Sequence, residues 1–128
     1  MSIIIVVEDE LIVGEYLSDI LTGKGYSVVA AANAESAIAM LENRDDVRGL
    51  ITDINMPGMS GVELYQRLIE AGRTIPTILI TAYPDKAIRD QALRDGVVCF
   101  LSKPVDDKHL DRCLRSALQP GTPIEDKS

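Results

Sequence analysis

The sequence predicts a single-domain α/β fold, in which a parallel sheet is covered by helices, and three observations lead to that prediction. Five short apolar runs alternate along the chain with five stretches whose apolar residues recur at helical spacing. Such alternation is typical of strands joined by crossover helices. The 128 residues suffice for one domain with its own core. A hydrophobic content of 46% with 26% charged residues is an ordinary balance for a globular protein.

The five predicted strands are the short apolar runs themselves. The longest of these runs has about five residues, which is far too short to span a membrane. Four of the five strands end in a polar residue that could bind a metal ion or a phosphoryl group. The predicted strands cover residues 3–7, 27–31, 49–53, 77–81 and 97–101.

The first two helices follow from apolar periodicity and from residues that begin or end a helix. The stretch from about Glu10 to Thr22 predicts the first helix, and Gly23 and Gly25 are natural stops for it. Asn33 can cap the second helix, with Glu35 in its first turn. The predicted buried face of the first helix comprises Val13, Tyr16, Leu17, Ile20 and Leu21, and that of the second comprises Ala34, Ala37, Ile38 and Leu41.

The remaining three helices are predicted in the same way. Ser60 or Gly61 precedes the third helix, which ends near Gly72. Pro84 suits the first turn of the fourth helix, over residues 85–95. The last helix is expected at about 106–118, where four apolar residues recur at positions i, i+3, i+4 and i+7. These residues are Leu110, Cys113, Leu114 and Ala117.

Charge and cysteine content exclude several classes of function. The net charge is −7 and the isoelectric point is near 4.6, whereas a nucleic-acid surface needs clustered Lys and Arg. The sequence shows neither a membrane span nor a signal peptide, so we expect a cytoplasmic protein with no direct nucleic-acid or membrane partner. Cys99 and Cys113 lack metal-ligand spacing. We expect both to be reduced core or near-core residues.

The polar residues that follow four of the strands form a candidate site. Glu8-Asp9 follows the first strand, Asp53 ends the third, Thr81 ends the fourth, and Lys103-Pro104 follows the fifth. A carboxylate at the end of a buried strand is held rigidly below and exposed above. Three carboxylates brought together repel one another unless a cation lies among them, and Mg²⁺ prefers oxygen ligands.

The string Asp-Ile-Asn-Met-Pro-Gly-Met-Ser-Gly from Asp53 to Gly61, combined with these residues, resembles one known family. The chain is similar to the receiver domains of two-component response regulators, the CheY-like family, from about Ile3 to Leu118. The resemblance implies a flavodoxin-like, doubly wound sheet of order 2-1-3-4-5 with helices on both faces. We expect a receiver domain over residues 1–119 and a flexible tail or linker stub over 120–128.

The resemblance also implies the chemistry of the site. Asp53 would accept a phosphoryl group from a phosphohistidine of a sensor kinase or a histidine phosphotransfer protein. Lys103 would balance charge on the phosphoryl group, and Thr81 would hydrogen-bond it. Mg²⁺ would be the cofactor, held directly by Asp9, Asp53 and the Asn55 carbonyl, with Glu8 acting through water.

Four further residues match positions concerned with switching and access in this family. Ala82 would leave room beside the phosphoryl group, and Phe100 would be the aromatic switch residue that turns inward when Thr81 moves. Pro104 would form a cis bond that aims Lys103. We expect the Tyr83 ring to cover the phosphoryl oxygens and slow dephosphorylation. The fourth helix, fifth strand and fifth helix would form the output face for a downstream protein.

Two other functions are alternatives. A Mg²⁺-dependent phosphatase of the haloacid dehalogenase type also forms an aspartyl phosphate, but Asn55 stands where that family has a second Asp. A protein-binding module that no longer uses phosphate is the other alternative, against which the complete set of site residues argues. We expect a stand-alone switch that catalyses only its own phosphorylation and dephosphorylation. The tail also fits a piece of a hybrid kinase or transcription factor, and the resemblance allows a phosphorylation-dependent dimer.

Overall fold

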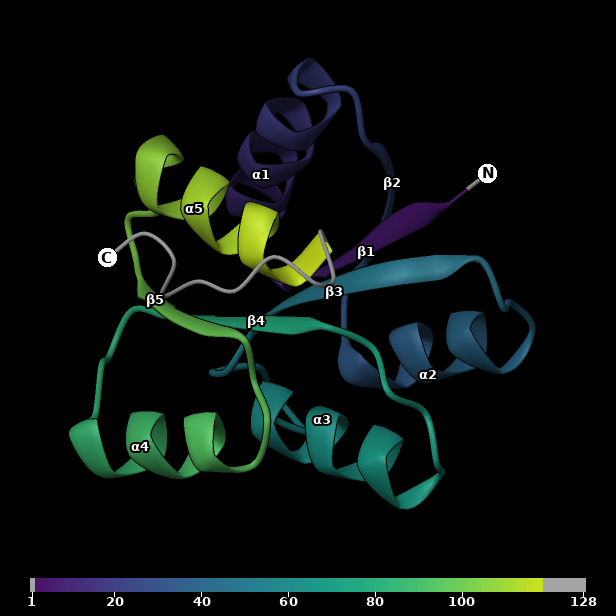
Figure 1. The fold of residues 1–128 in the computed structure, drawn as a ribbon, viewed down its shortest axis with the longest axis vertical. Helices are drawn as coiled ribbons and strands as arrows, with labels where there is room; N and C mark the ends of the chain where they lie inside the picture. Colours follow the sequence, from purple (N-terminus) through teal and green to yellow (C-terminus); the bar gives the residue numbers. More distant parts are fainter. Residues whose placement is uncertain (1, 119–128) are drawn as a thin grey trace.

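The computed structural model of the chain describes residues 2–118, which form a doubly wound parallel sheet (Figure 1). The strand order β2-β1-β3-β4-β5 confirms the predicted fold class and topology. The expected tail over 120–128, and the end of the domain at residue 119, lie outside the described residues. The elements are β1 Ile3–Val7, α1 Leu11–Gly23, β2 Ser27–Ala31, α2 Ala34–Glu42, β3 Val47–Asp53, α3 Gly61–Glu70, β4 Thr77–Thr81, α4 Lys86–Arg94, β5 Cys99–Ser102 and α5 Asp107–Leu118.

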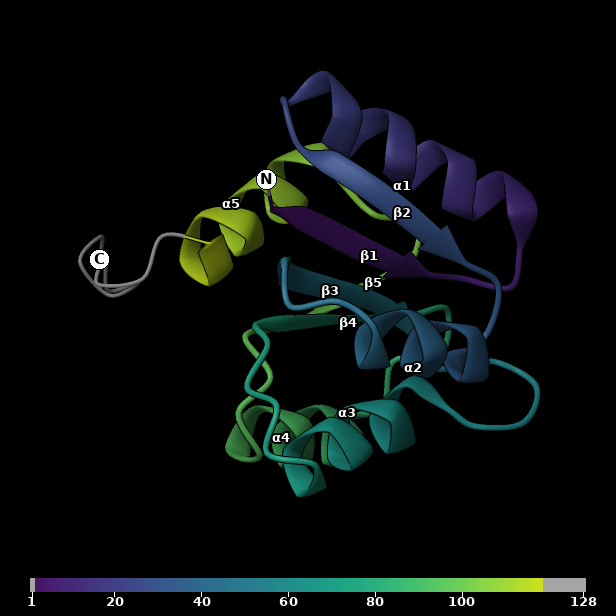
Figure 2. The same ribbon diagram turned by 90° about the vertical axis from the view of Figure 1, so that its right-hand side faces the viewer.

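Helices cover both faces of the sheet. Helices α1 and α5 lie on one face, and α2, α3 and α4 lie on the other (Figures 1 and 2). Successive strand residues point to opposite faces. Ile4 and Val6 of β1 therefore join the core under α1 and α5, whereas Ile3, Ile5 and Val7 join the core under α2 and α3. Burial on both faces explains why β1 is a continuous apolar run.

Two helix starts confirm the predicted caps, and one differs. Asn33 and Ser60 both accept hydrogen bonds from backbone N–H groups in the first turn of α2 and α3. Pro84 lies before α4 rather than in its first turn, because Asp85 is the N-cap and accepts a hydrogen bond from the Ile88 N–H. In residues 2–118, none of the helices is both long and apolar enough to traverse a bilayer.

The first residues of two strands also differ from the prediction. Strand β3 begins at Val47, two residues early, because Val47 pairs with Ile3 of β1. Strand β5 begins at Cys99, two residues late, because Val97 closes the turn after α4 by donating a hydrogen bond to the Ala92 carbonyl. Neither shift moves the residues at the carboxyl ends of the strands, where the candidate site lies.

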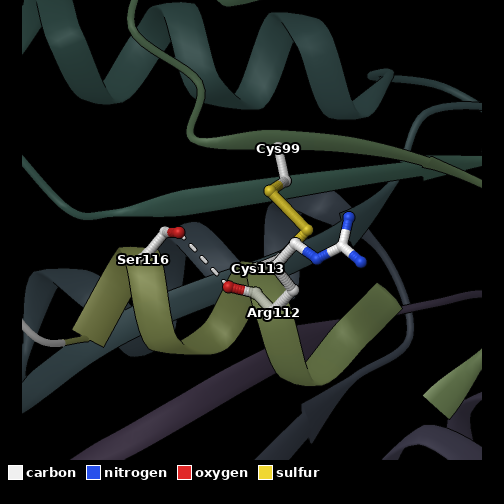
Figure 3. Close-up of a disulfide and its surroundings, with 4 residues drawn as sticks. All are labelled: Cys99, Arg112, Cys113 and Ser116. Carbon is white, nitrogen blue, oxygen red and sulfur yellow. Dashed lines mark hydrogen bonds between the residues drawn. A yellow bond between two sulfur atoms is a disulfide. The ribbon is translucent and has the colours of Figure 1, made fainter. Parts of the chain in front are cut away.

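The prediction that both cysteines are reduced is wrong for this structure. Cys99 of β5 and Cys113 of α5 form a disulfide, with their Cα atoms 5.8 Å apart (Figure 3). The two residues are 14 positions apart in the sequence. Sequence spacing could not show their approach, because it depends on how α5 packs back against the edge of the sheet.

Candidate functional site

The topology brings the predicted acidic residues together at the carboxyl ends of β1 and β3. These strands are direct neighbours in the sheet, and parallel strands end at the same edge. Glu8 and Asp53 are buried, with 5% and 2% of their surfaces exposed, whereas Asp9 is exposed. The site therefore has a rigid acidic floor and an open side.

Asp53 is fixed by hydrogen bonds on both carboxylate oxygens. The Asn55 backbone N–H donates to Oδ1 at 3.1 Å, and Lys103 Nζ lies 3.1 Å from Oδ2. The Ile54 N–H donates to the Ile80 carbonyl of β4 at 2.9 Å, which anchors the chain just after Asp53. A carboxylate held in this way has one orientation and one adjacent positive charge.

The loop after Asp53 folds back tightly, and this explains the end of the nine-residue string. A Cβ atom at Gly61 would overlap the Asp53 carbonyl oxygen, so the close approach requires glycine. Ser60 caps α3 by accepting from the Glu63 N–H, and the Glu63 side chain accepts from the Ser60 N–H, each at 3.1 Å. The Ser60-Gly61 pair therefore fixes the loop and not the chemistry.

Lys103 lies among three carboxylates. Its Nζ atom is 3.1 Å from Glu8 Oε1, 3.1 Å from Asp53 Oδ2 and 3.2 Å from Glu10 Oε1. Burial acts to lower the pKa of Lys103, but its bonds to these carboxylates outweigh burial and raise the pKa above its usual value. Lys103 is therefore a fixed positive charge. The Lys103–Pro104 peptide bond is cis, as the resemblance implies.

Glu8 is a buried carboxyl group that is incompletely satisfied. Burial raises its pKa to about 7, against the opposing effects of the Glu10 N–H and Lys103. Its Oε2 atom accepts from the Glu10 N–H at 3.1 Å. Its Oε1 atom forms an ion pair with Lys103 but has no hydrogen-bond partner of good geometry. A buried oxygen of this kind has unused capacity for a ligand.

Three of the carboxylates could hold a cation. Glu8, Asp9 and Asp53 each offer an oxygen, and these oxygens lie within 4.8 Å of one another. An all-oxygen, strongly negative cluster beside an unused buried oxygen suits a hard divalent ion such as Mg²⁺. The residues present therefore fit the cofactor expected from the sequence.

Thr81 lies at the rim of the site, bonded on both sides. Its hydroxyl donates to Asn55 Oδ1 and accepts from the Tyr83 N–H at 3.0 Å. The neighbouring Ala82 is exposed, and Tyr83 is 75% exposed, so its ring is not packed over the site. The shielding role expected for Tyr83 therefore stays a prediction about the phosphorylated chain.

Phe100 lies half-buried on β5, which β4 separates from the strand that carries Asp53. Its strand partner is Leu79 of β4, and its ring packs against the small core under α3 and α4. Thr81 pairs with Ser102 two residues further along the same two strands. The rim of the site and the aromatic residue are thus connected by one pair of adjacent strands.

Sequence reasoning missed two features beside the site. Glu10 is predicted only as the approximate start of the first helix, but its carboxylate reaches Lys103, and its side chain makes no capping hydrogen bond. Ile12 of α1 is 80% exposed, and Leu11 and Tyr16 are also exposed. Tyr16 was predicted on the buried face, but it is 47% exposed, and its hydroxyl donates to the Val105 carbonyl. The sequence signal for this exposed surface is the apolar pair Leu11-Ile12, which directly follows three acidic residues.

The doubly wound fold, with clustered acidic residues and a lysine at the carboxyl ends of its strands, is typical of one class of signalling domain. Comparison with known families gives the same class. Residues 4–115 match the response regulator receiver domain family. The chain therefore belongs to the receiver domains of two-component response regulators, which act as signalling switches and not as classical enzymes.

Two curated proteins are similar to the chain over most of its length. It is 39% identical over 114 residues to a 14.6 kDa protein in the sodA1 3′ region of Leptolyngbya boryana, covering 88% of this chain and 86% of that protein. It is 38% identical over 114 residues to the transcriptional regulatory protein FixJ of Rhizobium meliloti, again covering 88% of this chain. The chain spans about half of FixJ, since the match covers 54% of that protein.

A solved structure supports the same assignment. The crystal structure of FixJ-N superposes with a TM-score of 0.84 and 31% sequence identity. The superposition covers 96% of this chain and 98% of that one. The agreement therefore extends over the whole described domain and not over one motif.

Proposed function

We propose that Asp53 accepts a phosphoryl group from a phosphohistidine of a sensor kinase or a histidine phosphotransfer protein. One observation carries this proposal: the Asp53 carboxylate is buried, oriented by the Asn55 N–H and paired with Lys103 beside a cluster of two further acids. Receiver domains of response regulators receive their phosphoryl group from histidine kinases, so the donor class follows from the family.

The proposed reaction needs little from the protein beyond positioning and charge balance. An Asp53 oxygen forms a bond to phosphorus while the donor's P–N bond breaks. The imidazole leaves with the electron pair and takes up a proton from solvent. Lys103 shifts from carboxylate oxygens to a phosphoryl oxygen, and the Thr81 hydroxyl donates to another. The chain thereby modifies only itself.

We assign the metal site to Glu8, Asp9, Asp53 and the Asn55 backbone carbonyl, with Glu8 acting through a water molecule. The unused Glu8 oxygen and the 4.8 Å clustering of three carboxylates support Mg²⁺. Bound there, Mg²⁺ supplies positive charge that offsets the charge on the phosphoryl oxygens. Asp9 and Asp53 would then be relieved of their mutual repulsion.

The proposed output depends on the path from Thr81 to Phe100. Thr81 would exchange its bond to Asn55 for one to the phosphoryl group. Phe100 would then turn inward and change the face formed by α4, β5 and α5, which contacts a downstream protein. A switch of this kind needs a differential energy of a few kcal/mol between its two states.

The phosphohistidine donor must contact the surface around Asp53, and the exposed side of α1 provides a suitable contact surface. Ile12 and Tyr16 line an apolar pocket together with Lys103, Pro104 and Val105. Exposed apolar side chains directly beside a charged reaction centre suit a protein partner. We assign this α1 surface to the phosphodonor.

The acceptor assignment is tested with acetyl phosphate, a small donor, in the presence of Mg²⁺. The intact mass should increase by one phosphoryl group, and hydroxylamine should remove it. Asp53→Asn should abolish the uptake, whereas Asp45→Asn, at an exposed aspartate in the loop before β3, should leave it unchanged. Equal uptake by the Asp53→Asn chain would refute the assignment.

A further inference from the structure

The Cys99–Cys113 disulfide joins two of the three elements that form the proposed output face, β5 and α5. Figure 3 shows the bond running from β5 to α5, where Cys113 lies one residue after Arg112. The chain contains only these two cysteines. The pair therefore has no competing cysteine within the chain.

The two sulfur-bearing residues differ in their accessibility. Cys113 is 4% exposed and belongs to the core under α1 and α5, together with Leu110 and Leu114. Cys99 is half-buried and is the first residue of β5, the strand at the edge of the sheet. Cys99 is therefore the more accessible of the two residues and the one expected to meet a small thiol or disulfide first, while Cys113 is protected by packing.

The position of Cys99 connects the bond to the proposed switch. Cys99 and Leu101 face the core under α5, whereas Phe100 between them packs on the opposite face of the sheet. A covalent bond from Cys99 to α5 thus fixes the strand at the residue next to Phe100. Movement of β5 relative to α5 is restricted while the bond is present.

We propose that Cys99 and Cys113 are a reversible redox-modification site that locks α5 to β5. The oxidant is a low-molecular-weight disulfide such as oxidised glutathione. The Cys99 thiolate attacks one sulfur of that disulfide and releases one small thiol. Cys113 then displaces the second small thiol from Cys99. The two protein thiols give up two electrons and two protons, which leave on the two small thiols.

Equilibration of the native chain with glutathione buffers of varied ratio tests this site. Samples are quenched with acid, then alkylated with iodoacetamide in denaturant at mildly alkaline pH, so that both thiols can react, and weighed by mass spectrometry. We expect one transition from a doubly alkylated to an unalkylated chain, fully reversed by dithiothreitol without unfolding. Two alkyl groups at every ratio, in a chain that retains its native circular dichroism spectrum, would overturn the proposal.

Single-cysteine variants separate the pair from independent oxidation. Cys99→Ser should leave Cys113 unmodified by glutathione, because Cys113 is buried. Cys113→Ser should instead acquire one glutathione on Cys99. If Cys113→Ser does not react at all, the accessible thiol on which the exchange depends is absent and the proposal fails.

Thermal unfolding provides a readout that does not involve phosphorylation. A bond across 14 residues should raise the Tm of the oxidised chain above that of the reduced chain, by roughly 10 °C. Cys99→Ser, which can form neither the disulfide nor a mixed disulfide at residue 99, should show no redox-dependent Tm. Amides of α5 should also exchange hydrogen more slowly in the oxidised chain. Equal Tm and exchange rates in both redox forms would show that the bond does not lock α5. Because these measurements omit phosphoryl donors, their outcome is separate from that of the Asp53 assignment.

Discussion

At the scale of single residues, the site is dominated by one lysine shared among several carboxylates. Lys103 contacts Glu8, Asp53 and Glu10, of which only Glu10 is exposed. Burial disfavours the ionised form of Glu8, and Glu10 competes for Lys103 from the solvent side. These two glutamates can be tested separately, because one affects stability and the other affects access to Lys103.

Glu8→Gln should stabilise the metal-free chain at pH 8, by up to ~3 kcal/mol. The Glu8 pKa is raised from 4.5 in a model peptide to about 7 in the folded chain. The folded wild-type chain therefore loses stability as the pH rises from about 4.5 to 7, because a buried proton must leave. Glutamine keeps the neutral shape at all pH values. Urea unfolding with EDTA at several pH values should show the two chains converging near pH 4.5; a gap that does not depend on pH would contradict this account.

Glu10→Gln should speed phosphorylation by acetyl phosphate roughly two- to fivefold. The exposed Glu10 carboxylate bonds to Lys103 at 3.2 Å, and an exposed ion pair is worth roughly 0.2–1 kcal/mol. Removing its charge frees Lys103 for the phosphoryl group and lowers repulsion of the donor. The rate of mass gain measures the effect. Glu15→Gln, on the exposed side of α1, is the matched control, and an equal acceleration in both chains would point to net charge alone.

Features of the site that depend on residues close in the sequence could be predicted, whereas features that depend on tertiary packing could not. Asp9, Asp53 and Lys103 were identifiable because each lies at or just after the end of a predicted strand, and the topology then brings them together. The disulfide was not identifiable, because it depends on the packing of α5 against an edge strand. The outward position of Tyr83 likewise depends on the loop after β4, for which the sequence has no periodic signal.

At the scale of elements, the loop from Asp53 to α3 is built around a close backbone approach. Gly61→Ala should destabilise the chain by about 1–3 kcal/mol, because its Cβ would overlap the Asp53 carbonyl. Gly23→Ala is the control, since nothing lies within 4 Å of its Cβ position and it ends a helix. Urea midpoints should fall for the first chain and hold or rise for the second. Unchanged stability in Gly61→Ala would mean that the loop can shift freely.

The exposed surface of α1 makes a different prediction. Ile12→Asp should reduce phosphotransfer from a phosphohistidine protein at least tenfold, because a buried charge at a protein interface is costly. It should leave phosphorylation by acetyl phosphate within twofold of wild type. Ile69→Asp on α3 is a control at a similarly apolar, exposed position away from the pocket. Stopped-flow or gel assays with both donors measure the difference. Parallel loss with both donors would instead indicate damage to the site.

At the scale of the whole molecule, metal binding and folding should be linked. The proposed ligands come from the ends of β1 and β3, so the site exists only in the folded chain. Mg²⁺ at ten times its dissociation constant should therefore stabilise the chain by about 1.4 kcal/mol. Thermal unfolding in MgCl₂, against NaCl of equal ionic strength, measures this. Asp9→Asn should remove the difference. A shift that persists in Asp9→Asn would indicate general screening of the net charge of −7.

The fold class was predictable from the sequence pattern, but the order of the strands in the sheet was not. Alternating apolar runs and amphipathic stretches indicate a parallel sheet, yet several windings satisfy that pattern. The order with β1 beside β3 came from the family resemblance, and it places Glu8 next to Asp53.

The distance between the site residues along the chain has a consequence for synthesis. Lys103 reaches Glu8 across 95 residues and Asp53 across 50. A ribosome therefore releases the acids long before the lysine that balances them. Because β5 and α5 emerge last, a nascent chain carries unbalanced acids and an uncovered sheet edge until nearly all of the domain is made. Competence to be phosphorylated should thus appear abruptly, once β5 and α5 have left the ribosome, and would report on complete folding of newly made receiver domains.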